Sequence, residues 1–285
     1  MIKSDDNLIA TPGETGRLLA QLQKNPRKKL GQNFLVDQDK AMKIAASALE
    51  LPAAPILEIG AGLGGLSQLL RPYTEKLMLL ELDHRLVLHL RALFAPDEQV
   101  QVVEANALNF DYGALAHTPG WMGYHVFGNI PYHITSELVE RLLDDKSWLS
   151  MTLLIQKEAA QRLLADPGRS NSPLTLRICY HATGEILFSV PRSCFSPAPE
   201  VDSAVIRLIR RSQPLVAGEE QQLCRLINAG FSLRRKTLIN ALMAAGYPGD
   251  KAAFGVLLHA CGLKPQIRAE ELSLTDYAKL LSAME

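Results

Sequence analysis

The chain has 285 residues, of which 47% are hydrophobic and 21% are charged, and its thirty basic and thirty acidic side chains cancel. This composition is that of an ordinary globular protein, so net charge alone predicts no nucleic-acid partner. No run of about 18 apolar residues is present, and the acidic, polar N-terminus does not match a secretory signal. We therefore expect no membrane association and a cytoplasmic location.

The four cysteines are scattered along the chain, with no CxxC pair and no histidine at zinc spacing. This spacing argues against a disulfide framework and against a structural metal. We therefore expect no metal ion and reduced cysteines.

The N-terminal part of the chain has weak periodicity, and we predict a flexible arm over residues 1–26 with one helical turn near 17–23. An amphipathic helix is predicted over 39–51. Short apolar segments then alternate with helix-like ones. The predicted strands are 55–60, 76–83, 100–106, 124–129 and 150–157, and the helices are 65–73, 84–94, 135–144 and 158–166. This alternation is typical of an α/β fold whose parallel sheet has helices on both faces.

The pattern changes in the last third of the chain. Two further strands, 184–191 and 203–211, could form an antiparallel edge pair. From Pro214 onward only helical segments separated by Gly or Pro follow. They span 219–231, 234–246, 250–262 and 273–284. We therefore predict one domain over 27–213 and a small all-helical domain over 214–285.

The segment "LEIGAGLGGLS" lies between the first strand of the sheet and the next helix. Glycines at the carboxyl end of a strand, here Gly60, Gly62 and Gly64, let the backbone approach a ligand closely. A tight turn without a ligand is the alternative interpretation. Glu58 precedes the first glycine, and Glu81 ends the next strand. These acidic residues suit a cofactor with an ammonium group and a ribose diol better than they suit a pyrophosphate.

Polar residues also end the second and third strands. A carboxylate at Glu81 can accept both ribose hydroxyl groups, whereas Asp83 fits the role of a helix N-cap better. The amide of Asn106 can pair with the edge of an adenine, because it both donates and accepts hydrogen bonds. A simple turn at Asn106 explains the same residue equally well.

The segment "VFGNIPYHITSELV" follows the fourth strand. Methylation of an aromatic amine requires the nitrogen lone pair to be withdrawn from the ring, and two acceptors that hold the amino hydrogens can achieve this. The candidates are the side-chain oxygen of Asn129 and the carbonyl of Ile130. Pro131 has no N–H and a fixed φ, which helps to hold that carbonyl. Tyr132 offers a face for a base turned out of its stack. A strand-to-helix turn alone explains Pro131 only.

A set of motifs from Arg27 to the C-terminus resembles, in order, those of the small-subunit ribosomal RNA adenine dimethyltransferases. They are "LGQNFLVD", "LEIGAGLGGLS", "LELD", "EANAL", "FGNIPYHI", "FSPAPEVDSAV", "FSLRRKTLINAL" and "RAEELSLTDYAKL". The resemblance implies a Rossmann-like class I methyltransferase domain with a C-terminal helical rRNA-binding domain. It also implies that S-adenosylmethionine is the methyl donor. The product would be N6,N6-dimethyladenosine at two adjacent positions in the 3'-terminal hairpin loop of 16S rRNA, in the small ribosomal subunit. We expect a monomer with a role in small-subunit biogenesis.

The resemblance also implies roles for single residues. Tyr132 would stack on the target base, and Phe195 would help to sandwich it, although a core phenylalanine is the alternative for Phe195. Asn106 stands where the family usually has Asp, which removes charge assistance from the contact with adenine. The residues implied to bind the cofactor are Asn33, Leu35, Gly60, Gly62, Glu81, Asn106 and Asn129.

Two further features bear on the comparison with the family. After "LLADPGRS", the chain has "NSPLTLRI" where the family usually shows a Tyr-Gly pair before the next helix, so that helix could begin differently. Two basic clusters, which could be plain solvated surface, become candidates for gripping rRNA phosphates. They consist of Arg27, Lys28 and Lys29, and of Arg234, Arg235 and Lys236.

Three alternative functions remain open from the sequence. An erythromycin-resistance type methyltransferase acting on 23S rRNA shares the catalytic motifs, although the two C-terminal motifs favour the small-subunit enzymes. An RNA-binding assembly factor without catalysis would account for Asn106. A DNA adenine methyltransferase is disfavoured because no separate sequence-reading module is evident.

Overall fold

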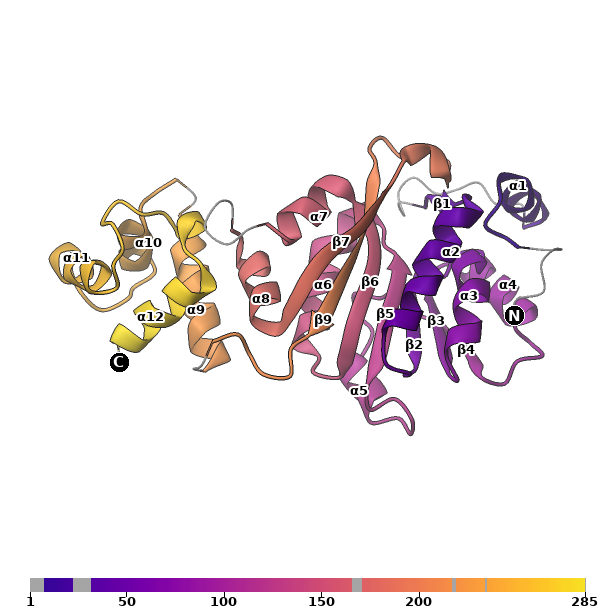
Figure 1. Ribbon diagram of the computed structural model, residues 1–285, viewed down its shortest axis with the longest axis horizontal. Coiled ribbons are helices and arrows are strands. Elements are labelled where there is room, and N and C mark those ends of the chain that lie inside the picture. The colour runs from indigo at the N-terminus through magenta and orange to yellow at the C-terminus, as the bar shows by residue number, and fades with distance from the viewer. Residues whose placement is uncertain (1–7, 23–31, 166–170, 217–218, 234, 285) are drawn as a thin grey trace. The chain divides into compact units, whose positions relative to one another are not determined.

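The computed structural model describes residues 8–22, 32–165, 171–216, 219–233 and 235–284 (Figure 1). The chain divides into two compact units. The first consists of Met1–Ala160 and Glu185–Ile209, and the second of Gln161–Gly184 and Arg210–Glu285. This division differs from the expected linear one, because the segment Gln161–Gly184 belongs to the unit that contains the C-terminal helices.

A seven-stranded sheet in the order β4-β3-β2-β5-β6-β9-β7 forms the centre of the first unit. Its strands are β2 (Ile56–Ile59), β3 (Leu77–Glu81), β4 (Val100–Glu104), β5 (Tyr124–Asn129), β6 (Trp148–Gln156), β7 (Ala182–Val190) and β9 (Ser203–Arg210). Strands β4, β3, β2, β5 and β6 are parallel, and β9 pairs antiparallel with β6. Every predicted strand is present, with its ends shifted slightly, and the α/β class is confirmed.

The burial of each strand follows from its place in the sheet. Every residue of β2 and β3 is buried, because parallel strands inside such a sheet are covered by helices on both faces. Strand β4 lies at the edge, and its Gln101 and Glu104 are exposed. The position in the sheet therefore explains why the inner strands are apolar throughout and why the edge strand is mixed.

Helices cover both faces of this sheet, and α2 and α3 lie in front of it with α6 behind it in Figure 1. The helices between Gln38 and Leu163 are α2 (Gln38–Ala46), α3 (Gly65–Leu70), α4 (His84–Leu93), α5 (Tyr112–Ala116), α6 (Thr135–Asp144) and α7 (Lys157–Leu163). Asp37 and Asp83 cap α2 and α4, since their carboxylates accept hydrogen bonds from backbone N–H groups of the first helical turn. The capping role expected for Asp83 is confirmed. No helix among the described residues is long and apolar enough to cross a membrane.

The described part of the N-terminal region is folded onto the first unit. Helix α1 (Pro12–Gln21) begins after Thr11, whose hydroxyl accepts a hydrogen bond from a backbone N–H of the first turn. Leu18 and Leu19 are buried in a small cluster that includes Leu63 of the glycine-rich segment. Residues 8–22 are therefore not the flexible arm that we expected, because an apolar stripe on α1 finds a partner surface that the local periodicity does not reveal.

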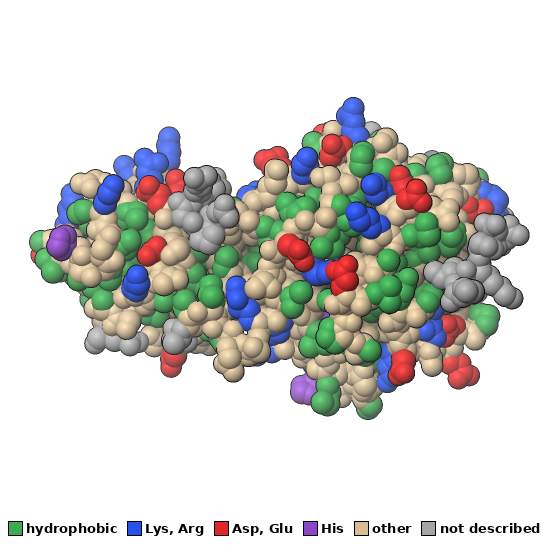
Figure 2. All heavy atoms as spheres, in the orientation of Figure 1, with side chains coloured by type: hydrophobic (Ala, Val, Ile, Leu, Met, Phe, Trp, Pro, Cys, Tyr) green, Lys and Arg blue, Asp and Glu red, His purple; other side chains and the backbone are tan. Residues whose placement is uncertain are grey.

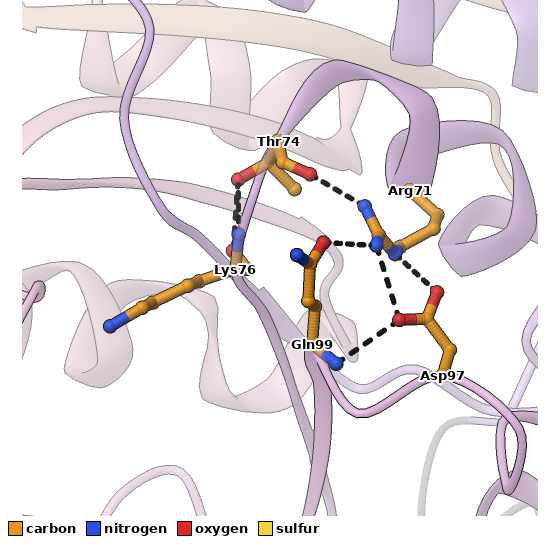
Figure 3. Close-up of polar contacts among 5 residues, drawn as sticks. All are labelled: Arg71, Thr74, Lys76, Asp97 and Gln99. Carbon is orange, nitrogen blue, oxygen red and sulfur yellow. Dashed lines mark hydrogen bonds and ion pairs between the residues drawn. The ribbon is translucent and has the colours of Figure 1, made fainter.

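A polar network joins the segments that precede β3 and β4 (Figure 3). The Arg71 guanidinium donates to the carbonyl oxygen of Thr74 at 2.7 Å and to Asp97 Oδ1 at 3.1 Å, and it also contacts Gln99 Oε1. The hydrogen bond from Arg71 holds the pKa of Asp97 below its usual value. The Lys76 N–H donates to the Thr74 hydroxyl at 3.2 Å. The Arg71 side chain thus holds together the segments that lead into β3 and β4. These segments lie at the end of the sheet opposite the carboxyl ends of the strands.

The second unit is helical. Its helices are α8 (Pro173–His181), α9 (Glu220–Phe231), α10 (Leu238–Ala244), α11 (Lys251–Ala260) and α12 (Leu274–Met284), with the short 3-10 helix η6 (Ala269–Glu271). They enclose a separate core in which Leu226, Leu238 and Tyr277 are fully buried. Helix α8 begins in the segment where the family usually has Tyr-Gly, with Ser172 as its N-cap. The helix predicted from residue 234 begins at Leu238 instead, so Arg235 and Lys236 lie in a turn.

A buried histidine lies near the start of β5. His125 Nε2 is 2.8 Å from the carbonyl oxygen of Pro52, and Nδ1 is 2.8 Å from the hydroxyl of Ser150. A carbonyl can only accept, so Nε2 carries the hydrogen and the neutral ring accepts at Nδ1. Burial lowers the pKa of His125, because desolvation disfavours the imidazolium.

We predict that this histidine makes stability fall at mildly acidic pH. An unfolded histidine titrates near pH 6.5, whereas the folded site resists protonation, so stability is complete above about 6.5 and is lost as pH falls. The free energy of unfolding of the wild type, measured between pH 7.5 and 5, should decline relative to His125→Gln by up to about 1.4 kcal/mol per pH unit. Burial also lowers the pKa of His181 in the second unit, so the difference between the two proteins isolates His125. Parallel curves would contradict this account.

Candidate active site

A cavity of about 430 Å³ opens at the carboxyl ends of β2, β3, β4 and β5. The chain continues from β2 outward to β3 and β4 and then returns to place β5 on the other side of β2. Ligands of open α/β sheets bind at this reversal. The residues that line the cavity include Gln32, Asn33, Phe34, Gly60, Gly62, Glu81, Leu82, Asn106, Ala107, Asn129, Pro131, His133, Ile134 and Glu137.

The glycine-rich segment forms one wall of the cavity. Gly60 and Gly62 have φ values of 74° and 60°, a region that side chains disfavour. Gly64 at the start of α3 serves packing instead, because a Cβ there would lie 2.8 Å from Leu93 and 3.1 Å from Leu90 of α4. The first two glycines therefore keep the cavity open, and the third brings α3 against α4.

The position of Gly128 accepts no side chain, a constraint that was not predicted from the sequence. A Cβ at this position would lie 2.6 Å from the carbonyl oxygen of Ile59 and 2.7 Å from the Ile130 side chain. Only a glycine permits β5 to approach β2 so closely at the level of the cavity. Its place directly before Asn129 at a strand end was the available sequence signal.

Glu81 holds the end of β3 to the glycine-rich segment. Its Oε2 accepts a hydrogen bond from the Gly62 N–H at 2.9 Å, and its Oε1 accepts from the N–H groups of Leu82 and Asp83 at 3.0 and 2.9 Å. Burial nevertheless raises the pKa of this carboxyl. The Glu81 carboxylate thus lines the cavity, as a role in binding the ribose requires. It also orders the glycine-rich segment that follows the neighbouring strand β2.

Asn106 lies in the cavity wall after β4. Its Oδ1 accepts a hydrogen bond from the Leu108 N–H at 3.0 Å, which is the side-chain turn that the alternative interpretation predicts. Its Nδ2 has no hydrogen bond to a described residue. The two interpretations are therefore compatible, because the turn uses the oxygen and leaves the amino group as a donor beside the cavity.

Asn129 is the last residue of β5, and its side-chain amide is anchored. Nδ2 donates to the backbone carbonyl oxygen of Asn33 at 2.8 Å. This contact fixes the rotation of the amide, so Oδ1 is the atom that can accept a hydrogen bond from a ligand. Asn33 therefore contributes through its backbone, by orienting Asn129.

Pro131 of the motif lines the cavity, whereas Ile130 and Tyr132 are not among its lining residues. Ile130 is 1% exposed, and its N–H donates to the carbonyl oxygen of Leu154 at 3.0 Å, which extends the ladder between β5 and β6 by one residue. The hydroxyl of Tyr132 is 2.8 Å from that of Ser203 in β9. Burial raises the pKa of Tyr132. Tyr132 is half-buried, and its stacking role stays a prediction.

Phe195 is not brought to the cavity. Its ring is 4% exposed and packs in the main core of the first unit. It lies in the short strand β8 (Phe195–Ser196), which pairs antiparallel with β1 (Phe34–Leu35) so that Leu35 opposes Phe195. The structure therefore favours the core phenylalanine over the expected stacking role. Leu35 does not line the main cavity either. It lines a smaller cavity that shares Gly60, Gly62 and Asn129 with the main one.

Glu58 is a buried acid beneath the glycine-rich segment. It is 2% exposed, and its Oε2 has no hydrogen-bond partner among the described residues. Burial raises the pKa of Glu58 to about 8. It lines a cavity of about 50 Å³ whose other walls include Ile9 and Thr15. At neutral pH the group is therefore mostly an uncharged carboxylic acid in this structure.

Among the cavity residues that were not predicted from the sequence are Phe34 and Leu82. The ring of Phe34 lies 3.3 Å from the position that a Cβ of Gly62 would occupy. Leu82 is 49% exposed although apolar, and it lines the cavity next to Glu81. The signals were available, since Phe34 lies between Asn33 and Leu35, and Leu82 is an apolar residue between two acids at a strand end.

The basic clusters are only partly visible. Arg235 and Lys236 are exposed in the turn before α10 of the second unit. Lys and Arg side chains gather along one edge of the part that holds α10 and α11 in Figure 2. The remaining predicted RNA-binding residues, Arg27, Lys28, Lys29 and Arg234, lie outside the described residues. An RNA-binding role of either cluster therefore stays a prediction.

The fold and the cavity define the protein as a class I S-adenosylmethionine-dependent methyltransferase. A model of the family "Ribosomal RNA adenine dimethylase" matches residues 23–283. The chain belongs to this family and is an S-adenosylmethionine-dependent rRNA adenine dimethyltransferase.

Relatives and solved structures agree with this assignment. The Ribosomal RNA small subunit methyltransferase A of Pelotomaculum thermopropionicum is 35% identical over 283 residues, which is 96% of each chain. The same-named protein of Geobacter metallireducens is 37% identical over 263 residues, 90% of this chain and 95% of its own. The crystal structure of the 23S rRNA methyltransferase ErmE superposes with a TM-score of 0.70 and 28% identity, covering 88% of this chain and 99% of that one. A dimethyladenosine transferase from Plasmodium falciparum shares the fold with a TM-score of 0.69 and 24% identity, covering 85% of this chain and 94% of that one.

We predict that Glu81→Gln destabilises the protein and weakens cofactor binding. A glutamine offers one acceptor oxygen in place of two, so its NH₂ would face a backbone N–H and leave a donor unsatisfied. The loss should be about 1–3 kcal/mol in the free energy of unfolding, and calorimetry should show weaker binding of S-adenosylhomocysteine. The matched control is Glu140→Gln, which removes the charge of an exposed acid on α6 that does not line the cavity. Equal behaviour of the two variants would contradict the role of Glu81.

Proposed function

We propose that the protein transfers methyl groups from S-adenosylmethionine to N6 of two adjacent adenosines in the 3'-terminal hairpin loop of 16S rRNA. The observation that carries the chemistry is the anchored amide of Asn129, whose Nδ2 is held by the Asn33 carbonyl and whose Oδ1 is available to a ligand. Support for the small subunit comes from the names of the relatives, which match nearly the whole chain. We further propose a monomer that acts during small-subunit biogenesis.

The residues of the cavity fit this cofactor. Its lining contains no Lys or Arg among the described residues, and it contains the acids Glu81 and Glu137. Such a wall suits a ligand that carries a sulfonium and an ammonium group and disfavours a pyrophosphate. Glu81 would hold the ribose, Asn106 Nδ2 would donate to the adenine edge, and Gly60 and Gly62 would leave room for the methionine portion.

The residues around Asn129 are suited to prepare the target amine. Oδ1 of Asn129 and the carbonyl of Ile130 would each accept one amino hydrogen of the adenosine, which keeps the nitrogen lone pair directed away from the base. When bound, S-adenosylmethionine supplies an electrophilic methyl group. The proton released from N6 passes to water, since the product ammonium is a strong acid. After the first transfer a single N–H remains, and one of the two acceptors suffices to orient it.

The fold does not discriminate between the two ribosomal subunits. The 23S rRNA methyltransferase ErmE shares the fold at a TM-score of 0.70, so subunit choice has to depend on surfaces outside the common core. The motifs "FSLRRKTLINAL" and "RAEELSLTDYAKL" belong to the second unit. We therefore assign the selection of 16S rRNA to that unit.

The substrate can be tested with labelled S-adenosylmethionine and purified ribosomal subunits from cells that lack adenine dimethylation. We expect label in the small subunit, confined to the 3'-terminal hairpin and released on digestion as N6,N6-dimethyladenosine. The large subunit serves as the matched control. Label in the large subunit alone would overturn the assignment of the substrate, and tight binding without transfer would overturn the proposed activity.

We predict that Asn129→Ala reduces methyl transfer by a factor of about 10² or more, because an oriented acceptor at the reacting amine is lost. Binding of S-adenosylhomocysteine should be largely retained, since the proposed partner of Oδ1 is the target base. The control is Asn109→Ala, which removes an exposed amide that does not line the cavity. If Asn129→Ala instead loses cofactor binding, the assignment of Asn129 to the target base is wrong.

A further inference from the structure

Asn106 lies in a turn after β4 that is fixed by hydrogen bonds to both of its oxygens. Its side-chain Oδ1 accepts from the Leu108 N–H at 3.0 Å, and its carbonyl oxygen accepts from the Asn109 N–H at 2.9 Å. A backbone N–H can only donate, so the amide atom that contacts Leu108 must be the oxygen. The backbone therefore sets the orientation of the Asn106 amide, and Nδ2 is the side-chain atom left for a ligand.

The next residue of the turn has the same polarity. The carbonyl oxygen of Ala107 accepts a hydrogen bond from the Tyr112 hydroxyl at 2.8 Å, whereas the Ala107 N–H has no hydrogen bond to a described residue. Asn106 and Ala107 both line the main cavity. Each oxygen of these two residues already accepts a hydrogen bond, and their polar groups without a partner in the described part of the chain are N–H donors.

An adenine presents both kinds of hydrogen-bonding atom at its edges. Its ring nitrogens are acceptors, and its 6-amino group is a donor. A wall that offers donors pairs with the ring nitrogens and would meet the 6-amino group donor to donor. A carboxylate, which the family usually has at position 106, has the opposite preference, because an ionised carboxylate can only accept. The exchange of one carboxylate oxygen for an NH₂ group therefore reverses what this wall can recognise.

We propose that this protein recognises the base of its cofactor through ring-nitrogen acceptors and does not read the 6-amino group, with Asn106 as the residue that sets this specificity. The inference rests on the proposed function, because it takes the adenine to lie against Asn106. It differs from a simple loss of charge assistance at an unchanged contact. The Asn106 oxygen is engaged by Leu108, so the contact itself changes direction.

The neutral contact has a consequence for the exchange of the cofactor. Hydrogen bonds to an ionised group are roughly twice as strong as those between neutral groups. Two methyl groups on one nitrogen require the spent cofactor to leave the cavity between the two transfers. A neutral donor at Asn106 holds the adenine less strongly than a carboxylate would, and this favours release of the spent cofactor.

The test measures the binding of two ligands to the full-length protein by calorimetry. The first ligand is S-adenosylhomocysteine, and the second is its analogue with purine in place of adenine, which lacks the 6-amino group. We expect the wild type to bind the two with affinities within about threefold of each other, because its wall gains nothing from the amino group. Removal of the amino group also makes the ring nitrogens slightly weaker acceptors, an effect that every variant shares.

Asn106→Asp should create the discrimination that the wild type lacks. An aspartate keeps the turn, since one carboxylate oxygen can still accept from the Leu108 N–H, and the other then accepts from the 6-amino group. We expect this variant to prefer S-adenosylhomocysteine over the analogue by about tenfold or more. The matched control is Asn109→Asp, which adds the same charge to an exposed residue of the same turn that does not line the cavity. Its preference should equal that of the wild type.

Two results would overturn the proposal. A wild type that prefers S-adenosylhomocysteine by more than about threefold would show that an acceptor reads the 6-amino group. Equal preferences in Asn106→Asp and Asn109→Asp would show that residue 106 does not set the specificity. Failure of the proposed function is distinct, because the wild type would then bind S-adenosylhomocysteine and yet transfer no methyl group to the small subunit.

Discussion

The site depends on the close approach of two strand ends, β2 and β5. Gly128 lies so near the carbonyl oxygen of Ile59 that no side chain fits, and Gly60 lies opposite the backbone of Asn129 on the neighbouring strand. This approach places the glycine-rich segment and the Asn129 amide on two walls of one cavity. The Asn33 carbonyl then fixes the amide. Without the approach, the same residues would form two unrelated turns.

The carboxyl groups of Glu81 and Glu137 give the cavity its electrostatic character. Glu81 is held by three backbone N–H groups, and burial raises its pKa even so. Glu58 lies beneath the loop in the smaller cavity, and with a pKa of about 8 it adds little negative charge at neutral pH. Hydrogen bonds to a carboxylate favour its charged form while desolvation opposes it. A wall of this kind favours a cationic cofactor and repels phosphates.

The strands and several cavity residues could be predicted from the sequence, whereas the place of Phe195 and the extent of α1 could not. The strands were predictable because their apolar residues are continuous, and the cavity residues Gly60, Glu81, Asn106 and Asn129 were predictable because strand ends meet at one edge of the sheet. Phe195 was assigned to the site from its motif, yet its ring packs in the core, where antiparallel pairing of β8 with β1 holds it. Only one helical turn near 17–23 was predicted where α1 runs over Pro12–Gln21, since the stability of the full helix depends on a distant apolar surface around Leu63.

The sequence by itself determined the α/β class, the order of the elements and several of the residues that line the cavity, because periodicity and motif spacing are local properties. Tertiary structure decided which atoms of those residues are available. It turned the Nδ2 of Asn129 toward Asn33, used the Oδ1 of Asn106 in a turn, and gave Glu81 a second role in ordering the loop. It also brought Arg162, Arg235 and Arg268 to the wall of one cavity of the helical unit. Such contacts join residues far apart in the chain, and only the packing of the elements sets them.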